Sequence, residues 1–305
     1  MIDNLILLRI FTLAASLLLA GCYSHLNQHA ATEPGSADYD IDRVVDGIVY
    51  TPPYWPQPLQ ADLYLPQKNG PHPVVLTIHG GGWANRNRDD MAGISRKLAR
   101  HGYAVFNVSY RFAPYYTYPA QLHDIYQALA WIDKNAPTYN LDRNRLNVWG
   151  YSSGAHLAAL TASFDNDALP VSERNRLSSI RAVVAGGIPS DLRKYSGSPI
   201  VMRFMGGDRD EMPGRYAEAS PAYHISADDP PVFLYHGKLD FLVATDQATD
   251  YYKALLAAGI QAELYLHNWR EHMTMFVFGG HAENRAIQFL NRKNGTAARQ
   301  TARLN

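Results

Sequence analysis

The chain alternates between short apolar runs and amphipathic segments, and this alternation restricts its possible folds more than any other feature of the sequence. A continuous apolar run that ends in glycines, such as Val74–His79, is typical of a buried parallel strand. The runs that we expect to be strands are 44–50, 59–65, 74–79, 103–110, 146–150, 182–186, 232–235 and 262–267. Helical spacing is found in 91–101, 119–134, 155–162, 246–258 and 282–291. The sequence therefore predicts an α/β fold with a mostly parallel central sheet of about eight strands and helices on both faces.

Composition excludes several classes of protein. The 305 residues are 47% hydrophobic, and 28 basic side chains balance 28 acidic ones. A disordered chain would combine low hydrophobicity with high net charge, and a nucleic-acid-binding chain would carry an excess of basic residues. The single cysteine excludes an internal disulfide framework and a cysteine-rich zinc site. We therefore expect a globular domain without a nucleic-acid partner.

The N-terminus has the features of a targeting segment. Ile10–Ala20 is apolar and uncharged, is too short to span a bilayer, and fits the apolar region of a secretory signal. The run ends in Leu19-Ala20-Gly21-Cys22, which resembles a bacterial lipoprotein cleavage box. We therefore expect residues 1–21 to be a signal peptide and the Cys22 thiol to carry lipid. An ordinary signal peptide with a chance cysteine and an uncleaved anchor are the alternatives.

The rest of the chain divides into three parts. Residues 22–40 are polar and small and are expected to form a tether, 41–292 a globular domain and 293–305 a polar tail. A lipidated Cys22 would anchor an exported protein to the bacterial cell envelope. Tyr23 stands where lipoproteins retained in the inner membrane commonly have aspartate, which weakly favours the outer membrane.

A G-x-S-x-G motif lies between an apolar strand and a helix, in Gly150-Tyr151-Ser152-Ser153-Gly154. Small neighbours let such a tight turn close, although the nucleophile itself must adopt strained backbone angles. The N-terminus of the following helix favours a developing anion. Ser153 is the alternative nucleophile, but the glycine spacing selects Ser152.

Three adjacent glycines follow the strand that ends at Ile78, in His79-Gly80-Gly81-Gly82-Trp83. Without side chains in the way, their N–H groups can turn toward a substrate oxygen and form an oxyanion hole. The alternatives are a flexible loop or a phosphate cradle, but a phosphate loop would carry Lys and Ser or Thr where this chain has Trp83-Ala84. We expect His79 to hold the loop by hydrogen bonds.

An acid and a base are expected beyond two later strands. Asp240, in His236-Gly237-Lys238-Leu239-Asp240, follows the strand 232–235 and is suited to orient a histidine. His272 lies just beyond the last strand and is the candidate general base. The competing residues end a strand or lie in or near helices, where structural roles are expected: His156, Asp246, Asp250, His267 and His281. The chain order Ser152, Asp240, His272 is that of α/β-hydrolases.

These three motifs, together with Tyr110-Arg111-Phe112-Ala113-Pro114, resemble the α/β-hydrolase carboxylesterases from about residue 40 to the last helix. The similarity is greatest to hormone-sensitive-lipase-like and bacterial feruloyl or acetyl-xylan esterases. It implies an α/β-hydrolase fold and a small-molecule ester as substrate, with no metal or organic cofactor. The residues it implies are a triad of Ser152, Asp240 and His272, and oxyanion-hole amides from Gly81, Gly82 and Ser153. The family's Y-R-L-A-P-E stretch is altered at Phe112 and Tyr115, and we expect this segment to be structural.

A lid is expected in Leu192–Ile225, between two strands, because residues 23–40 are too few and too polar to build an N-terminal cap. This segment contains several aromatic residues that either line a pocket or pack in the interior: Tyr195, Phe204, Tyr216 and Tyr223.

The reaction that these residues favour is two-step acyl transfer through an acyl-enzyme. A kynurenine-formamidase-like amidase shares the architecture, although that group often has tyrosine in place of Gly82. A peptidase of the prolyl-oligopeptidase type would carry an N-terminal propeller, for which the sequence gives no sign. A catalytically silent, membrane-tethered binding protein would be expected to have a broken motif, and none of the motifs is broken.

Overall fold

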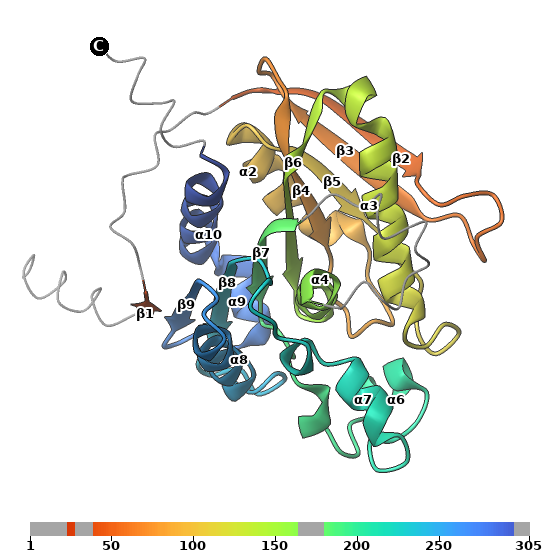
Figure 1. The fold of residues 1–305 in the computed structure, drawn as a ribbon, viewed down its shortest axis with the longest axis vertical. Coiled ribbons are helices and arrows are strands. Elements are labelled where there is room, and N and C mark those ends of the chain that lie inside the picture. Colours follow the sequence, from red (N-terminus) through yellow and green to blue (C-terminus); the bar gives the residue numbers. More distant parts are fainter. Residues whose placement is uncertain (1–22, 28–38, 164–179, 296–305) are drawn as a thin grey trace, which may run out of the picture.

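A nine-stranded sheet forms the centre of the protein in the computed structural model, which describes residues 23–27, 39–163 and 180–295 (Figure 1). The strands are β1 (Tyr23–Leu26), β2 (Ile41–Val49), β3 (Gln60–Pro66), β4 (His72–Ile78), β5 (Ala104–Val108), β6 (Leu141–Tyr151), β7 (Ile180–Gly186), β8 (Val232–Gly237) and β9 (Ala262–His267). Their order across the sheet is β1-β9-β8-β7-β6-β4-β5-β3-β2. Strands β4 to β9 are parallel, whereas β1, β2 and β3 run antiparallel to their neighbours. The predicted α/β-hydrolase fold is confirmed.

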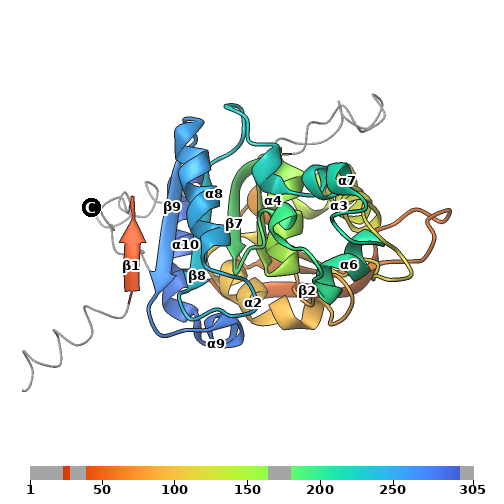
Figure 2. The same cartoon turned by 90° about the horizontal axis from the view of Figure 1, so that it is seen from below.

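Helices cover both faces of this sheet (Figure 2). The helices are α2 (Ala92–Arg100), α3 (Ala120–Tyr139), α4 (Ser153–Ser163), α6 (Pro199–Met205), α7 (Pro213–Glu218), α8 (Asp246–Ala257), α9 (His272–Phe278) and α10 (Gly280–Asn294), with 3₁₀ turns η1 (Arg88–Met91), η3 (Leu192–Lys194) and η4 (Pro221–Tyr223). Neighbouring residues of one strand enter different cores: Val148 packs in one hydrophobic cluster and Trp149 in the other. Because both faces are buried, the central strands are continuous apolar runs rather than alternating ones.

The segment 22–40, expected to be a tether, contains regular structure at its start. Residues Tyr23–Leu26 form β1, which pairs antiparallel with β9 and places Tyr23 opposite His267. The Tyr23 ring also stacks on Tyr265, with the centroids 4.9 Å apart. An edge strand such as β9 offers unpaired backbone groups, and β1 satisfies them. Four residues of the expected tether are therefore part of the domain.

Helix α10 continues through Asn294, two residues into the predicted polar tail. The predicted signal peptide 1–21, Cys22 and residues 296–305 lie outside the described residues. No helix in the described ranges is both long and apolar enough to cross a membrane.

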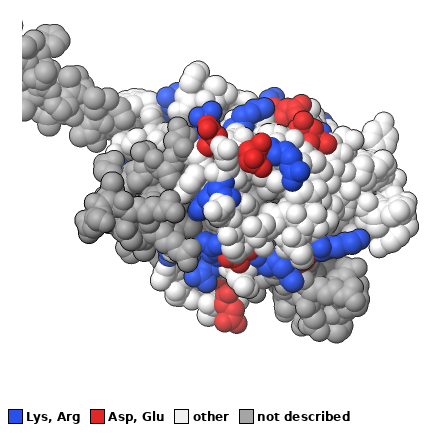
Figure 3. Space-filling model, turned by 90° about the horizontal axis from the view of Figure 1, so that it is seen from above, with Lys and Arg blue, Asp and Glu red and all other residues white. Residues whose placement is uncertain are grey.

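Charged side chains of both signs are interspersed on the face of the molecule that Figure 3 shows. This mixture agrees with the formal net charge of zero. A buried ion pair lies in the segment that was expected to be structural: Arg111 Nη2 lies 2.7 Å from Asp124 Oδ1. The backbone N–H of Arg111 donates to the same carboxylate at 2.9 Å, so the pair ties the loop after β5 to helix α3.

Candidate active site

Ser152 lies on a tight turn between β6 and α4, with a left-handed backbone conformation at φ +54°. Few residues other than glycine adopt this conformation, and it is strained in serine. The Ser152 N–H donates to the Gly186 carbonyl oxygen at 2.7 Å, which fixes the turn against β7. The strained turn that the G-x-S-x-G spacing predicts is therefore present.

The two outer glycines of this turn are needed because other backbone atoms fill the space beside them. A Cβ atom on Gly150 would lie 2.1 Å from the Gly154 carbonyl oxygen, and one on Gly154 would lie 2.1 Å from the Ile78 carbonyl oxygen. Real Cβ atoms do not approach backbone so closely, so the turn closes only when both positions lack a side chain.

Gly154→Ala is therefore expected to lower the free energy of unfolding by about 1–3 kcal/mol, because the new methyl group must displace the end of β4. Urea unfolding followed by circular dichroism measures this loss. The matched control is Gly93→Ala in α2, where an added Cβ meets no atom within 4 Å. The control should gain about 0.5–1 kcal/mol from helix propensity. Equal urea midpoints for the two variants would contradict this account of the turn.

Three side chains that are far apart in the sequence form a continuous line of hydrogen bonds. His272 Nε2 lies 2.9 Å from Ser152 Oγ, and His272 Nδ1 lies 2.6 Å from Asp240 Oδ2. With the Nδ1 proton donated to the carboxylate, Nε2 is free to accept the proton of the Ser152 hydroxyl. The side chains of His272 and Asp240 are buried, with exposed fractions of 4% and 0%.

The carboxylate of Asp240 is held from several sides. Its Oδ1 accepts the backbone N–H groups of Leu242 at 3.0 Å and Val243 at 2.8 Å. Its Oδ2 also lies 3.1 Å from Nε2 of the fully buried His236. Burial alone would raise the pKa of Asp240, but hydrogen bonds from His236 and His272 together with the backbone donors hold that pKa well below its usual range. Asp240 is therefore ionised at neutral pH and can orient His272.

Two residues help to hold Asp240 and His272 in place, and neither of them was predicted from the sequence to do so. His236 belongs to the motif that contains Asp240, but nothing in the motif shows that its ring contacts the carboxylate. The Tyr151 hydroxyl donates to the His272 backbone oxygen at 2.6 Å and fixes the start of α9. Tyr151 occupies a variable position of the G-x-S-x-G motif, so no sequence signal marks it.

The glycine loop lies beside Ser152 and shares a cavity of about 280 Å³ with it. The cavity is lined by the predicted oxyanion residues Gly81, Gly82 and Ser153, as well as by Ser152 and His272. Gly81 and Gly82 have φ values of +119° and +59°, which glycine adopts without strain. The structure thus brings all of these residues together around one space.

Two other histidines have structural positions, as expected. His79 Nδ1 lies 2.6 Å from the Gly80 oxygen and holds the glycine loop. His156 accepts from Trp83 Nε1 at 3.2 Å and donates Nε2–H to the Ala219 oxygen at 2.6 Å. Burial lowers the pKa of each of these imidazoles to about 4. Both rings are therefore neutral at pH 7.

These two histidines should make the fold sensitive to acid. In the unfolded chain they take up protons near pH 6.5, whereas in the folded chain they do so only near pH 4. Stability is therefore complete above pH 6.5 and is lost as the pH falls toward 4. The loss should be roughly 2 kcal/mol for each histidine by pH 5. Urea unfolding at pH 7 and pH 5 measures it, and a free energy of unfolding that is equal at the two values would contradict the assignment.

The competitors for the catalytic roles lie apart from this line. Asp246 and Asp250 are exposed residues of α8 that pair with Lys194. His267 ends β9, and its Nδ1 accepts the Trp269 N–H at 3.2 Å. The described parts of the chain hold no group of three or more His, Cys, Asp or Glu side chains arranged for a metal ion.

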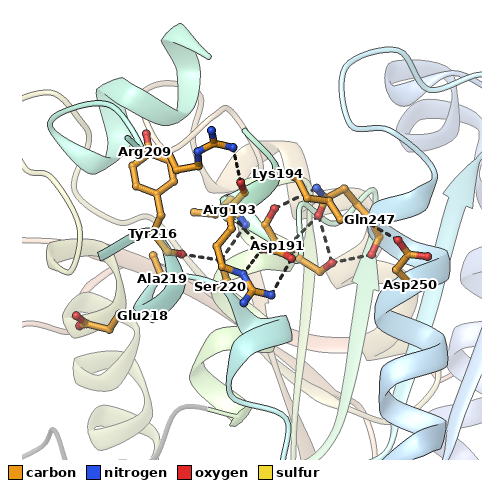
Figure 4. A network of polar contacts seen from close by, with 12 residues as sticks. Asp191, Arg193, Lys194, Arg209, Tyr216, Glu218, Ala219, Ser220, Gln247 and Asp250 are labelled. Atoms are coloured by element: carbon orange, nitrogen blue, oxygen red, sulfur yellow. Dashed lines mark hydrogen bonds and ion pairs between the residues drawn. The ribbon is translucent and has the colours of Figure 1, made fainter. Parts of the chain in front are cut away.

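The segment expected to be a lid, Leu192–Ile225, is fastened to helix α8 (Figure 4). Just before the segment, Gln247 Oε1 accepts the Asp191 N–H at 2.8 Å, and Ser190 Oγ donates to the Gln247 backbone oxygen at 2.6 Å. Lys194 Nζ reaches Asp250 at 2.7 Å. The segment includes α6 and α7 and supplies one wall of the cavity.

The four aromatic residues of this segment have different roles. Tyr195 lines the cavity, and its buried hydroxyl has no hydrogen-bond partner among the described residues. Phe204 stacks on Trp83 with ring centroids 4.3 Å apart, and Tyr216 is fully buried. Tyr223 is 58% exposed. Of these four residues, Tyr195 alone lines the cavity, where it can contact a bound molecule.

A mostly parallel sheet, a strained serine turn after a central strand, and an acid and a histidine beyond later strands define an α/β-hydrolase. Residues 61–255 match the BD-FAE family, and the chain belongs to that family. Esterase LipQ from Mycobacterium tuberculosis is 29% identical over 201 residues, 63% of this chain and 48% of that protein. The probable carboxylic ester hydrolase LipM from the same organism is 31% identical over 205 residues, 64% of this chain and 48% of that protein. This chain spans about half the length of these curated relatives.

Solved structures share the fold. A truncated form of a carbohydrate esterase from gut microbiota superposes with a TM-score of 0.75 and 22% identity, covering 86% of this chain and 99% of that one. Esterase 2 from Thermogutta terrifontis, phosphoramylated by tabun, gives a TM-score of 0.71 and 20% identity, covering 83% of this chain and 96% of that one. At these sequence identities, the structural similarity shows a shared fold and nothing more.

Proposed function

We propose that the chain hydrolyses carboxylic esters by transferring the acyl group to Ser152. The observation that carries this proposal is the line of hydrogen bonds from Ser152 Oγ through His272 to Asp240. Membership of the BD-FAE family and relatives named as esterases support the same reaction class. A silent binding protein would have no use for a strained serine that faces an oriented imidazole.

In the first step His272 Nε2 takes the proton of Ser152 Oγ as the oxygen attacks the ester carbonyl. The carbonyl oxygen becomes an oxyanion, to which the N–H groups of Gly81, Gly82 and Ser153 would donate. Asp240 stabilises the imidazolium that forms. The C–O bond to the alcohol then breaks, and the alcohol leaves with the proton from His272 Nε2.

In the second step water attacks the acyl-enzyme. His272 Nε2 takes a proton from the water, a second oxyanion forms in the same place, and Ser152 Oγ leaves with that proton. The products are the carboxylic acid and the free enzyme. This chain's residues supply every proton transfer in the cycle, so the proposed reaction needs no metal or organic cofactor.

The cavity favours esters with a short acyl group. Its volume of about 280 Å³ lies at the small end of ligand cavities, which are about 300–1,000 Å³. We expect kcat/KM for p-nitrophenyl acetate or butyrate to exceed that for the palmitate ester by at least about tenfold. A panel that adds feruloyl esters and N-formylkynurenine separates this proposal from the amidase alternative. Faster turnover of N-formylkynurenine than of every ester would overturn it.

We also propose that the chain is exported and carries lipid on Cys22, the only cysteine, at the end of the apolar run Ile10–Ala20. Mass spectrometry of the N-terminal peptide from the bacterial envelope tests this proposal. It should find a lipid-modified Cys22 as the first residue. An unmodified Cys22, or a chain that retains residues 1–21, would contradict it.

A further inference from the structure

Large apolar side chains are concentrated in two segments beside the cavity, the loop before α8 and the segment 269–278 that includes α9. The set that we call the apolar rim consists of Leu239, Phe241 and Leu242 before α8, and Trp269, Met273, Val277 and Phe278 in and before α9. Phe241 is 86% exposed and Trp269 is 70% exposed. Single exposed apolar residues are ordinary, whereas a contiguous group commonly marks an interaction surface.

Backbone hydrogen bonds join these two segments. The Leu239 N–H donates to the Arg270 oxygen at 3.0 Å, and the Lys238 N–H donates to the His267 oxygen at 2.9 Å. Leu242, from the loop before α8, and Met273, from α9, line the cavity together with Ser152. The apolar rim therefore lies directly at the mouth of the candidate active site.

The N-terminal segment enters the described structure beside this rim. Because β1 is antiparallel to β9, its first residue, Tyr23, lies opposite His267, the last residue of β9. Trp269 follows only two residues later. In Figure 2 the start of β1, the end of β9 and helix α9 lie at the same end of the molecule.

Strand β1 is firmly held in this place. His25 Nε2 lies 3.1 Å from Glu263 Oε2, and each of these side chains is only 3% exposed. Arg292 Nη2 lies 2.6 Å from the other oxygen of Glu263. Burial alone would raise the pKa of Glu263, but its contacts with His25 and Arg292 lower that pKa on balance, so the carboxylate stays charged. A group attached to residue 22 is thus one Cα–Cα step, about 3.8 Å, from a fixed part of the domain.

We propose that the apolar rim is seated on the lipid bilayer, so that the mouth of the cavity opens against the membrane. This inference rests on the proposed lipidation of Cys22. Lipid chains one residue before Tyr23 would hold this end of the sheet close to the bilayer, and the apolar rim begins there with Trp269, two residues beyond the His267 that Tyr23 faces. The lipid chains alone are enough to anchor the protein to the membrane. The role of the rim is therefore to orient the anchored domain.

Basic residues beside the rim suit this orientation. Lys238 is exposed, and the Arg270 guanidinium lies 5.1 Å from the centroid of the Phe278 ring. Such side chains can lie along apolar surface while their charged ends reach lipid phosphate groups. The class of substrate that this orientation favours is an amphiphilic ester that partitions into the membrane and presents a short acyl group to Ser152.

Brominated lipids test the orientation through Trp269. The full protein, purified with its own N-terminus, is reconstituted into phosphatidylethanolamine and phosphatidylglycerol vesicles with or without brominated acyl chains. The difference in emission between wild type and Trp269→Phe isolates the Trp269 signal. We expect brominated chains to quench this signal at least about twofold. Absence of quenching in vesicle-bound protein would overturn the proposal.

The decisive variant is Phe241→Glu/Phe278→Glu, which should stay bound to vesicles through its lipid but lose the quenching. Tyr54→Glu is the matched control, because Tyr54 is 80% exposed and follows β2 at the opposite edge of the sheet. Circular dichroism checks that each variant is folded. Quenching that persists in the double variant, or a rim-dependent dimer that shields Trp269 from lipid, would overturn the proposal.

The same experiment separates this inference from the two proposals made above. Ser152→Ala should be quenched as strongly as wild type, so the result does not depend on ester hydrolysis. The mass of the Cys22 peptide reports lipidation independently of both. Lipidated, vesicle-bound protein with an unquenched Trp269 would therefore contradict only the membrane-facing rim.

Discussion

Ser152→Ala is expected to lower kcat/KM for p-nitrophenyl butyrate by about 10⁴- to 10⁶-fold, because acyl transfer has no other nucleophile at the oriented imidazole. The hydroxyl that the variant lacks is the group that lies 2.9 Å from His272 Nε2. Steady-state kinetics on a preparation free of host esterases measures the loss, and circular dichroism should show an unchanged fold.

The adjacent serine provides the matched control. Ser153→Ala keeps the backbone N–H assigned to the oxyanion hole and removes only a hydroxyl that lies 3.3 Å from the Tyr110 hydroxyl. Its kcat/KM should stay within about tenfold of wild type. If Ser152→Ala retained wild-type turnover while Ser153→Ala lost it, the assignment of the nucleophile would be wrong.

Asp240→Asn is expected to lower kcat at neutral pH by about 10⁴-fold, because it would favour the tautomer of His272 that cannot act as a base toward Ser152. The backbone N–H groups of Leu242 and Val243 donate to Oδ1 of Asp240 and would hold the amide oxygen of asparagine in that place. The NH₂ group would then face His272 Nδ1 and favour the tautomer that carries its proton on Nε2. That nitrogen could no longer accept the proton of Ser152.

Asp246→Asn is the control for this variant, because Asp246 is an exposed acid of α8 whose partner is Lys194. Surface ion pairs contribute little, so its activity and stability should be close to those of wild type. Steady-state kinetics at pH 7 and urea unfolding compare the two variants. Loss of activity in both, or in neither, would contradict the role of Asp240 in orienting His272.

The sequence predicts the central strands because they are buried on both faces. Val74–His79 corresponds to β4 (His72–Ile78), and the run 182–186 falls within β7. A strand buried on both faces shows as an unbroken apolar run whatever surrounds it. The serine turn is marked by its own short motif, although only the contact at Gly150 is local and the one at Gly154 is with the end of β4.

Strand β1 could not be predicted, because its stability comes from elsewhere in the chain. The sequence Tyr-Ser-His-Leu has no strand pattern of its own. Its pairing depends on the free edge of β9 and on Glu263, which is more than 230 residues away. Tertiary contacts of this kind override local propensity.

The surroundings of the candidate site were predicted only in part. His272 was expected just beyond the last strand and is the first residue of α9, because Glu271 and Thr274 form a capping box there. Tyr195 lines the cavity whereas Phe204 is buried, and that difference depends on how α6 packs on the glycine loop. The contact of His236 with Asp240 depends on the path of the loop after β8.

The central claim is that His272 and Asp240 activate Ser152 as a nucleophile. A fluorophosphonate probe tests it most directly, because such a probe reacts only with an activated serine. Peptide mapping of the labelled protein should find a single adduct, on Ser152, and His272→Ala should abolish it. An unlabelled Ser152 in a folded protein, or labelling that persists without His272, would contradict the claim.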